Sequence, residues 1–458
     1  MLPGAWAARG VLMRPAYWRA NGCVVAGFAF FMLTGLAIGE PAGTTEEFES
    51  VPDRSPADLL PAAMVSGPNF HVVDPVHGDG LMNRFVLETH FGTFDAYGRA
   101  ALAIRIQEVA ALTALSKLSG IEIIAGGVTG GLQSEVKTTV RVVTNPVGVV
   151  TGIPKGITHL FEGYKASGQE AVSSVQRNVD SRGGGSASSG VKQGEDAAKS
   201  YAEHYLGITA AERAWYKRLG VNPYTDNKVL RDAVHKAART EAVGSFGVKF
   251  ASIPAIPGID IAQRTVDAIY NEDPAAVRAQ TRKALAGYGL DAKQIESFMN
   301  APLLNPARQQ LLLAIAGQLN GVSGRAELFT HAIGLTSNEE VQVYLVSAAL
   351  LAKAHASRAL ASMVPGVRLP AARTDDGGLV VCGAFEAVYW TQGVAQAAEQ
   401  LRHSLPALPQ GASRELWLLG TVSDRARQEA QSGGWQLHEV PEAPPTEPTQ
   451  AGNRRPDG

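Results

Sequence analysis

The sequence is poor in the residue types that form disulfides and thiolate metal sites. It has 458 residues but only two cysteines, Cys23 and Cys382. Because Cys23 lies in an apolar N-terminal segment, a chain cleaved after that segment keeps Cys382 alone. No intrachain disulfide, thiolate metal cluster or Cys-x-x-Cys redox pair can then form. Cys382 stands within LVVCGAF, so we expect it to be a small, buried apolar side chain.

The sequence also lacks an excess of charge of either sign. It has 41 Lys and Arg against 43 Asp and Glu, and a formal net charge of -2. Without surplus cations it has little with which to neutralise a phosphate backbone, so we expect no nucleic-acid partner. The G-x-S-x-G, H-E-x-x-H, Walker A and EF-hand patterns are absent too. No cofactor is predicted, and the sequence leaves open whether the protein is an enzyme.

Only one long apolar run is present, CVVAGFAFFMLTGLAIG at 23–39, and it follows three arginines. A basic region, an apolar run and small residues at its end are typical of a secretory signal peptide, and Met13 offers an alternative start. The run spans roughly 25 Å as a helix, short of the ~30 Å hydrocarbon core. We therefore predict that 1–39 is cleaved and that the protein is periplasmic or secreted. An inner-membrane anchor through 23–39 is the alternative.

Changes in composition divide the rest of the chain. They predict an α+β fold with an N-terminal hairpin-plus-helix region, a mainly α-helical middle domain and a small C-terminal α/β module. The expected segments are a mobile leader at 40–69, a mixed α/β domain at 70–165, a Gly/Ser-rich flexible linker at 166–195, a helical domain at 196–362, the α/β module at 366–440 and a disordered Pro-rich tail at 441–458.

The first folded region reads as a hairpin followed by a helix. NRFVLETHFGTFDAYG places Phe85 and Leu87 on one face by alternation, with Gly92 at a bend. The next segment, RAALAIRIQEVAALTALSKLSG, repeats apolar residues at helical spacing and stops at Gly120. We predict a strand or hairpin and then one long helix.

A glycine-rich stretch, IEIIAGGVTGGLQSEV at 121–136, is the nearest approach to a nucleotide-binding motif. A dinucleotide site needs G-x-G-x-x-G between a strand and a helix, and an acid about 20 residues later. Ala125 replaces the first glycine, and no Asp or Glu lies between 136 and 161. We therefore favour a different role for this stretch. Peripheral membrane contact through 121–165 remains an alternative.

The middle block is rich in helix start signals. Three capping boxes and two cap-then-proline pairs occur: Thr209 with Glu212, Asp291 with Gln294, Thr336 with Glu339, Asp273-Pro274 and Asn305-Pro306. PARQQLLLAIAGQL and NEEVQVYLVSAALLAKAH carry the most continuous apolar faces, so we expect them at the centre of the helical core.

The C-terminal block changes character again. TDDGG suits a hairpin turn between two strands, and the order of patterns that follows predicts β-β-α-β-α-β over 366–440. The last β-α-β would pair its strands in parallel if both join one sheet.

The densest polar cluster is HVVDPVHGDG. His71, His77 and Asp79 are the candidate metal ligands, since imidazole and carboxylate groups bind zinc or harder cations. Their spacing matches no specific metal motif, so a solvated loop is the favoured interpretation. His204 with Glu203 and His235 with Asp232 are interpreted as local surface pairs.

LGVNPYTDNKVLRDAV is the other string of interest. Asn222-Pro223-Tyr224 could form a partner-binding loop, but Asn-Pro opens turns, and Thr225 or Asp226 is expected to cap the next helix. We favour a turn followed by a cap.

Targeting is supported by the sequence, while a catalytic motif is not. We expect an exported cell-envelope protein with a structural or protein-interaction role and a protein partner. The alternatives are a secreted hydrolase whose site is assembled from distant residues, and a peripheral membrane-binding protein.

Overall fold

A computed structural model describes residues 48–118, 123–124, 127–128, 157–161, 207–240 and 263–440. It confirms a mixed α+β fold. The predicted signal segment, the linker at 166–195 and the tail at 441–458 lie outside the described residues. Within the described part of the chain, every helix is too short or too polar to cross a lipid bilayer.

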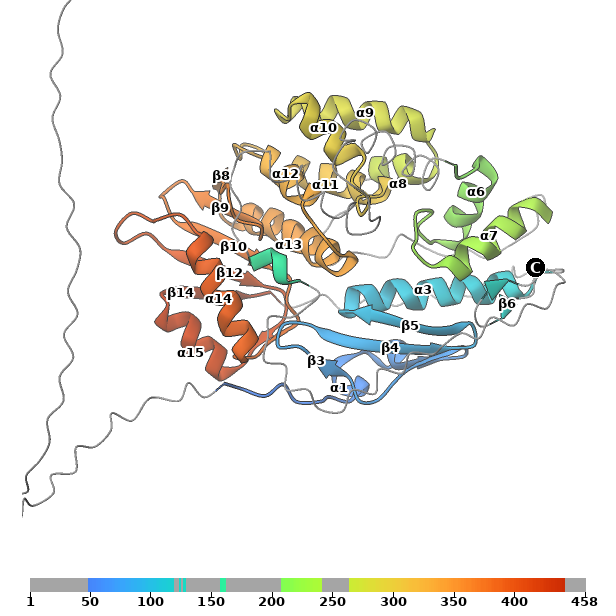
Figure 1. Cartoon of the computed structure of the whole chain (residues 1–458), viewed down its shortest axis with the longest axis horizontal. Helices are drawn as coiled ribbons and strands as arrows, with labels where there is room; N and C mark the ends of the chain where they lie inside the picture. Colours follow the sequence, from blue (N-terminus) through green and yellow to red (C-terminus); the bar gives the residue numbers. More distant parts are fainter. Residues whose placement is uncertain are drawn as a thin grey trace, which may run out of the picture. The chain divides into compact units, whose positions relative to one another are not determined.

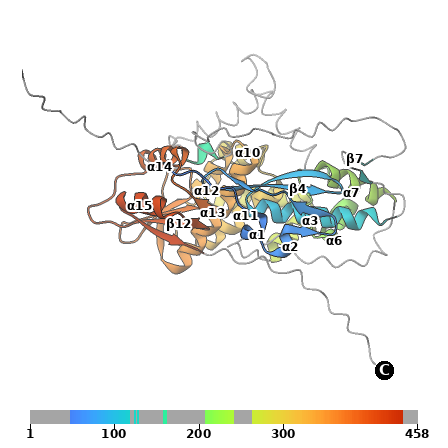
Figure 2. The same cartoon turned by 90° about the horizontal axis from the view of Figure 1, so that it is seen from below.

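An antiparallel sheet and one long helix form the N-terminal region, as predicted. β4 (Asn83–Thr89) and β5 (Gly92–Tyr97) make a hairpin whose turn contains Gly92, which has a φ of 120°. Helix α3 (Arg99–Ser116) packs along both strands (Figures 1 and 2). The smaller elements before the hairpin are α1 (Pro56–Leu59), α2 (Ala62–Val65), β1 (Ser66–Gly67), β2 (Phe70–Val72) and β3 (His77–Gly78).

The segment expected to be a mobile leader is partly built into this fold. Leu60 and Met64 are buried in the N-terminal core, and Arg54 pairs with Val76 through backbone hydrogen bonds. Upstream, Glu49 accepts a hydrogen bond of 2.6 Å from the Ser423 hydroxyl, far along the sequence. The composition is polar, but a few apolar anchors are enough to hold residues from 48 onward against the protein. Residues 40–47 lie outside the described part.

The glycine-rich stretch contains a short hairpin where it is described. β6 (Ile123–Ile124) pairs antiparallel with β7 (Gly127–Val128). The described residues at 127–128 therefore form a strand, whereas a dinucleotide cradle requires a helix after the first strand. Most of the segment proposed for membrane contact, 121–165, is outside the described residues, except for these strands and 157–161.

The middle block is helical, and its start signals are largely confirmed. Thr209 and Asp291 both form complete capping boxes, while Asp273 and Asn305 cap helices that begin with proline. The described helices are α6 (Ala210–Leu219), α7 (Lys228–Thr240), α8 (Gln263–Tyr270), α9 (Pro274–Gly287), α10 (Ala292–Met299), α11 (Pro306–Gln318), α12 (Ala326–Ile333) and α13 (Asn338–Ser357), with a 3₁₀ turn η1 (Thr158–Phe161) before them.

One predicted capping box is shifted by a residue. The N-cap of α13 is Ser337, whose hydroxyl accepts a hydrogen bond from the Glu340 amide at 3.1 Å. Thr336 instead donates its own amide and hydroxyl hydrogens to the Glu340 carboxylate. Two adjacent hydroxyl residues before two adjacent glutamates gave two equivalent sequence registers, and packing of the helix selects one.

The C-terminal module contains the predicted β-β-α-β-α-β order, with one additional strand in its sheet, β8, and a separate parallel pair, β11 with β13. Its sheet has the order β14-β12-β10-β9-β8, with antiparallel pairs at the β8 end and parallel β10-β12 and β12-β14 pairs. Cys382 is fully buried in β10, as expected. The elements are β8 (Leu360–Met363), β9 (Ala371–Thr374), β10 (Leu379–Gly383), β11 (Ala387–Val388), α14 (Gln392–Ser404), β12 (Arg414–Leu418), β13 (Thr421–Val422), α15 (Asp424–Ser432) and β14 (Trp435–Glu439).

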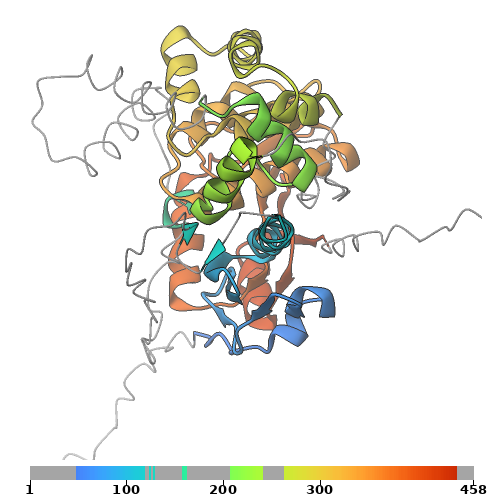
Figure 3. The same ribbon diagram turned by 90° about the vertical axis from the view of Figure 1, so that its right-hand side faces the viewer.

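Two hydrophobic cores hold these elements together, and they do not follow the predicted boundaries. One core joins Phe85 and Leu112 of the N-terminal region to Trp215 and Leu230 of α6 and α7. The other joins α9–α13 to the C-terminal sheet, and α11 and α13 lie within it as expected. The helical block is thus divided between two cores; Figure 3 shows the green helices α6 and α7 beside α3.

A buried carboxylate links the C-terminal module to the start of α3. Glu386 accepts hydrogen bonds from the Arg99 amide and from Asn83 Nδ2, the latter at 2.9 Å. Gly98, at the N-cap, has no side chain to satisfy the first helical amides, so a residue from the far end of the chain does so. Burial raises the pKa of Glu386, although its hydrogen bonds and Arg99 oppose that shift.

Candidate functional site

A cavity of about 400 Å³ lies between α3, the loop at 221–226 and the first turns of α11 and α13. We call it the Glu108 cavity, after the buried carboxylate that organises one of its walls. Its lining comes from both sides of the division between the two cores. Five segments that are distant in the sequence therefore meet around one space.

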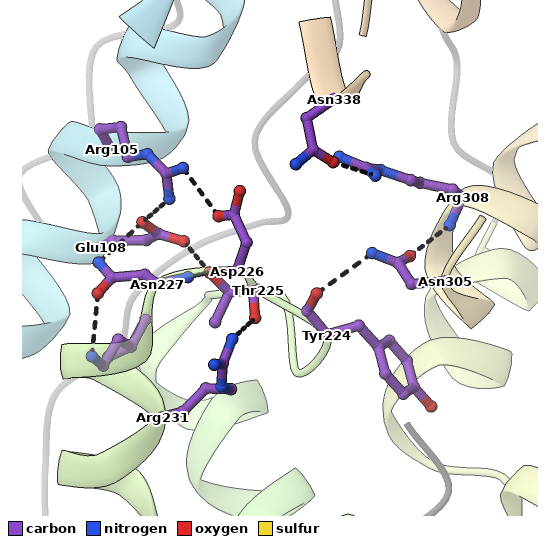
Figure 4. A network of polar contacts seen from close by, with 11 residues as sticks. Arg105, Glu108, Tyr224, Thr225, Asp226, Asn227, Arg231, Asn305, Arg308 and Asn338 are labelled. Carbon is purple, nitrogen blue, oxygen red and sulfur yellow. Dashed lines mark hydrogen bonds and ion pairs between the residues drawn. The ribbon is translucent and has the colours of Figure 1, made fainter. Parts of the chain in front are cut away.

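Glu108 on α3 organises the first wall. It is only 2% exposed, and its carboxylate accepts hydrogen bonds from the Thr225 hydroxyl and from Asn227 Nδ2 at 3.0 Å. Arg105, one turn earlier on α3, is 2.8 Å from the Glu108 carboxylate and 2.8 Å from that of Asp226 (Figure 4). A buried charge costs little only when it is paired and hydrogen-bonded, and here both oxygens of Glu108 have partners.

The two acids determine the protonation of Arg105. Burial alone would lower its pKa, but the carboxylates of Glu108 and Asp226 outweigh burial and raise the pKa above the ordinary arginine value. Arg105 is therefore a permanent cation that is already neutralised by the protein.

Local turn chemistry fixes the loop that carries the partners of Glu108. The Tyr224 amide donates to Asn222 Oδ1 at 2.9 Å, and the Asn227 amide donates to the Thr225 hydroxyl at 3.0 Å. The predicted turn is present. The predicted cap is wrong, because the residue that caps α7 is Asn227, whose Oδ1 accepts from the Leu230 amide at 3.1 Å. Thr225 and Asp226 are instead occupied by Glu108 and Arg105, which the local sequence does not reveal.

Helix N-termini form the opposite wall. Asn305 caps α11, and its Nδ2 donates to the Tyr224 carbonyl at 3.2 Å, which ties this wall to the loop. Arg308 donates to the Leu303 carbonyl at 2.7 Å and to Asn338 Oδ1, at the start of α13, at 2.8 Å. The guanidinium group of Arg308 thus holds the first turns of two helices together on this side of the cavity (Figure 4).

Three tyrosines add aromatic surface to the lining, Tyr97, Tyr224 and Tyr270. Burial raises the pKa of Tyr224 to about 12, so its hydroxyl is neutral at physiological pH. The Tyr270 hydroxyl donates to the Val221 carbonyl at 3.2 Å. Neutral phenol rings of this kind stack on apolar faces of ligands and can contact cations through their π faces.

The lining carries more acidic than basic groups. Four carboxylates and two guanidinium groups line it, which gives a formal charge of -2. Glu108 and Asp226 are paired with Arg105. Asp95 and Glu339 have no hydrogen-bond or ion-pair partner among the residues that the structure describes. The charge still available to a ligand is therefore negative.

Each of the three predicted metal ligands contacts a different protein group. His71 lies 3.2 Å from Glu88, and His77 Nδ1 lies 2.7 Å from Asp53. Asp79 is buried, and it accepts hydrogen bonds from the amides of Leu81 and Met82 and from the Tyr97 hydroxyl at 2.7 Å. In the described ranges, no three His, Cys, Asp or Glu side chains lie together as a metal site would require. Asp79 supports the Tyr97 side of the Glu108 cavity instead.

The predicted histidine pairs differ in outcome. His235 lies 2.7 Å from Glu212 on the neighbouring helix α6, whereas Asp232 pairs with Lys228 at 2.5 Å. His235 therefore makes a tertiary contact and not the local pair expected. His204 and Glu203 lie outside the described residues.

Comparison with protein-family models, with curated proteins and with solved structures found no match to this chain.

Sequence analysis did not identify Glu108, Arg105, Asn305, Arg308 or Asn338 as members of one site. One signal was available, because Arg105 and Glu108 are a charged i, i+3 pair in the middle of an otherwise apolar helix. A glutamate in that position must either reach solvent or find buried donors. The donors come from a loop more than a hundred residues later, which no local pattern indicates.

Proposed function

We propose that this protein is an exported component of the cell envelope that binds a small polar molecule in the Glu108 cavity. The observation that carries the proposal is the cavity itself, about 400 Å³ in volume and lined by side chains from five distant segments. A concave space of this size, with a few fixed polar groups and aromatic rings, is the usual form of a ligand site. The proposed partner is thus a small molecule, where composition alone suggested a protein.

The walls are preorganised for binding. Glu108, Thr225 and Asn227 are joined to one another by hydrogen bonds within the protein, and Arg308 fixes the opposite wall through Asn338. Groups that are already ordered lose little conformational entropy on binding, so more of the interaction energy appears as affinity.

The charges indicate which molecules the cavity favours. Both arginines are engaged by protein groups, whereas Asp95 and Glu339 have no partner in the described part of the chain. Since like charges repel in a partly desolvated site, anions are disfavoured. A neutral, hydroxyl-rich molecule or a small amine fits the tyrosine rings and the two carboxylates that have no partner in the described ranges.

Native mass spectrometry tests this proposal directly. The protein is recovered from the envelope fraction of the cells that make it, and its N-terminus is sequenced. We expect an N-terminus near Glu40 and a small molecule that remains bound at low activation energy. A chain that retains its N-terminal segment in membranes would contradict export, and one recovered without any bound small molecule, and taking up none from an extract of the same cells, would contradict binding.

A matched pair of variants locates the ligand. Ala101 lines the cavity on α3, whereas Ala110, also half-buried on the same helix, does not. Ala101→Trp should fill the space and abolish ligand retention, while Ala110→Trp should leave it unchanged. Equal retention by both variants would place the ligand elsewhere.

A further inference from the structure

A second cavity lies on the other side of the 222–227 loop, between α6 and α7. It has a volume of about 250 Å³, and we call it the Arg231 cavity. Its polar lining includes Glu212, Arg231, Asp232 and His235. We propose that it binds a small oxyanion, a phosphate or carboxylate group, through Arg231 and His235. This proposal does not depend on the function proposed for the Glu108 cavity.

The acids in this cavity already have partners within the protein. Glu212 accepts hydrogen bonds from the Thr209 amide and hydroxyl through one oxygen, at 2.7 and 2.8 Å, and contacts His235 Nδ1 through the other at 2.7 Å. Asp232 is paired with Lys228 at 2.5 Å. Neither carboxylate is left to repel an entering anion at full strength, and neither is free to hold a cation.

Arg231 carries the charge that remains. One of its nitrogens donates to the Thr225 carbonyl at 2.9 Å, and no carboxylate forms an ion pair with it in the part of the chain that the structure describes. The carbonyl bond orients the guanidinium group but does not neutralise it. Arginine presents several N–H donors in one plane, which match the oxygens of carboxylates and phosphates.

His235 adds a second group on the same side of α7, one turn after Arg231. Its contact with Glu212 fixes the ring, because Nδ1 faces the carboxylate and the ring's second nitrogen, Nε2, is left for another partner. Although partial burial acts in the opposite direction, the hydrogen bonds from His235 and Thr209 lower the pKa of Glu212, so it remains an acceptor at neutral pH. A protonated His235 can then donate Nε2–H to an oxyanion.

Calorimetric titration of the full chain with inorganic phosphate, and separately with acetate, tests this inference. We expect saturable binding of at least one of these anions, and the tighter one identifies the class. Arg231→Gln should weaken binding by about tenfold or more, a change of ~1.4 kcal/mol. His235→Gln should also weaken it, which keeps the test informative if the Arg231 variant folds poorly.

Arg239 provides the matched control. It is an exposed arginine on the same helix, two turns further on and outside the cavity. Arg239→Gln should change the affinity by less than about twofold, since distant surface charges are screened by salt. Failure of both anions to bind, or equal weakening by the Arg231 and Arg239 variants, would overturn the proposal. Unchanged affinity in both the Arg231→Gln and the His235→Gln variants would also overturn it.

Discussion

The Glu108 cavity and the Arg231 cavity share one loop but offer ligands opposite charges. In the larger one, Arg105 is paired with two carboxylates, Arg308 is hydrogen-bonded to neutral oxygens, and two carboxylates remain without partners in the described part of the chain. In the smaller one, both carboxylates have partners, and Arg231 has no ion-pair partner in the described part of the chain. The residue types in the two linings are similar, so composition alone does not decide the specificity. The internal pairing of each charge does.

The two cavities also differ in the contacts that fix their walls. Glu108 is almost completely buried and its network joins segments that are distant in the sequence. Glu212 belongs to a capping box within its own helix, and His235 is largely exposed. We therefore expect the larger cavity to be coupled to the stability of the fold, and the smaller one to be nearly independent of it.

The strongest test of this comparison is Glu108→Ala. The change leaves Arg105, Thr225 and Asn227 without their buried acceptor. Loss of one partner of a buried charge pair typically lowers the free energy of unfolding by about 3–5 kcal/mol. Urea unfolding measures the effect, and retention of the ligand in the Glu108 cavity should be lost as well.

The control for that variant is Glu399→Ala, which removes an exposed carboxylate paired with Arg402 and His403. Exposed pairs contribute little, so we expect no resolved change in the urea midpoint. If the two variants unfold alike, the Glu108 network does not hold the fold together and the contrast between the cavities fails.

An intermediate effect is expected for Thr225→Val, which keeps the shape of the side chain but removes its hydroxyl. Glu108 loses a donor and the Asn227 amide loses an acceptor, at a cost of about 1–3 kcal/mol in unfolding free energy. Because Thr225 lines both cavities, calorimetry should show weaker binding in each. Thr330→Val is the matched control, since that buried hydroxyl donates to a carbonyl of its own helix and is not among the lining residues of either cavity.

The smallest effect concerns the loss of thermal stability at acidic pH. The lowered pKa of Glu212 means that its contribution is fully present above the ordinary value of 4.5 and is lost as the pH falls through the folded-state pKa. Glu212→Gln should therefore flatten the decrease in thermal stability below about pH 4.5 while leaving ligand retention in the Glu108 cavity unchanged. If thermal stability falls with pH in the variant as it does in the wild type, the hydrogen bonds of Glu212 do not stabilise its ionised form.

Much of the fold follows from local sequence signals. The β4–β5 hairpin, the long helix α3, two complete capping boxes and the parallel end of the C-terminal sheet were predicted from alternation, helical spacing and turn residues. These features depend on neighbours in the sequence, which a single chain displays directly.

The sites could not be predicted in the same way. Glu108 is completed by Thr225 and Asn227, and the N-terminus of α3 is completed by Glu386, which is 287 residues away from Arg99. Such pairings are set by tertiary packing, so their partners have no fixed spacing. His235 illustrates the same point: the carboxylate next to it in the sequence is paired with Lys228, and the one it contacts is on another helix.

The loop at 222–227 has one further consequence, because Thr225 holds Glu108 through its hydroxyl and Arg231 through its carbonyl. An oxyanion that draws Arg231 away from that carbonyl changes the restraint on a residue that also forms a wall of the larger cavity. Thermodynamic linkage then requires reciprocity: the factor by which the anion alters the affinity of the first ligand equals the factor by which that ligand alters the affinity of the anion. Through Thr225 alone, a ligand bound in one cavity would change the affinity of the other cavity for a ligand of the opposite charge.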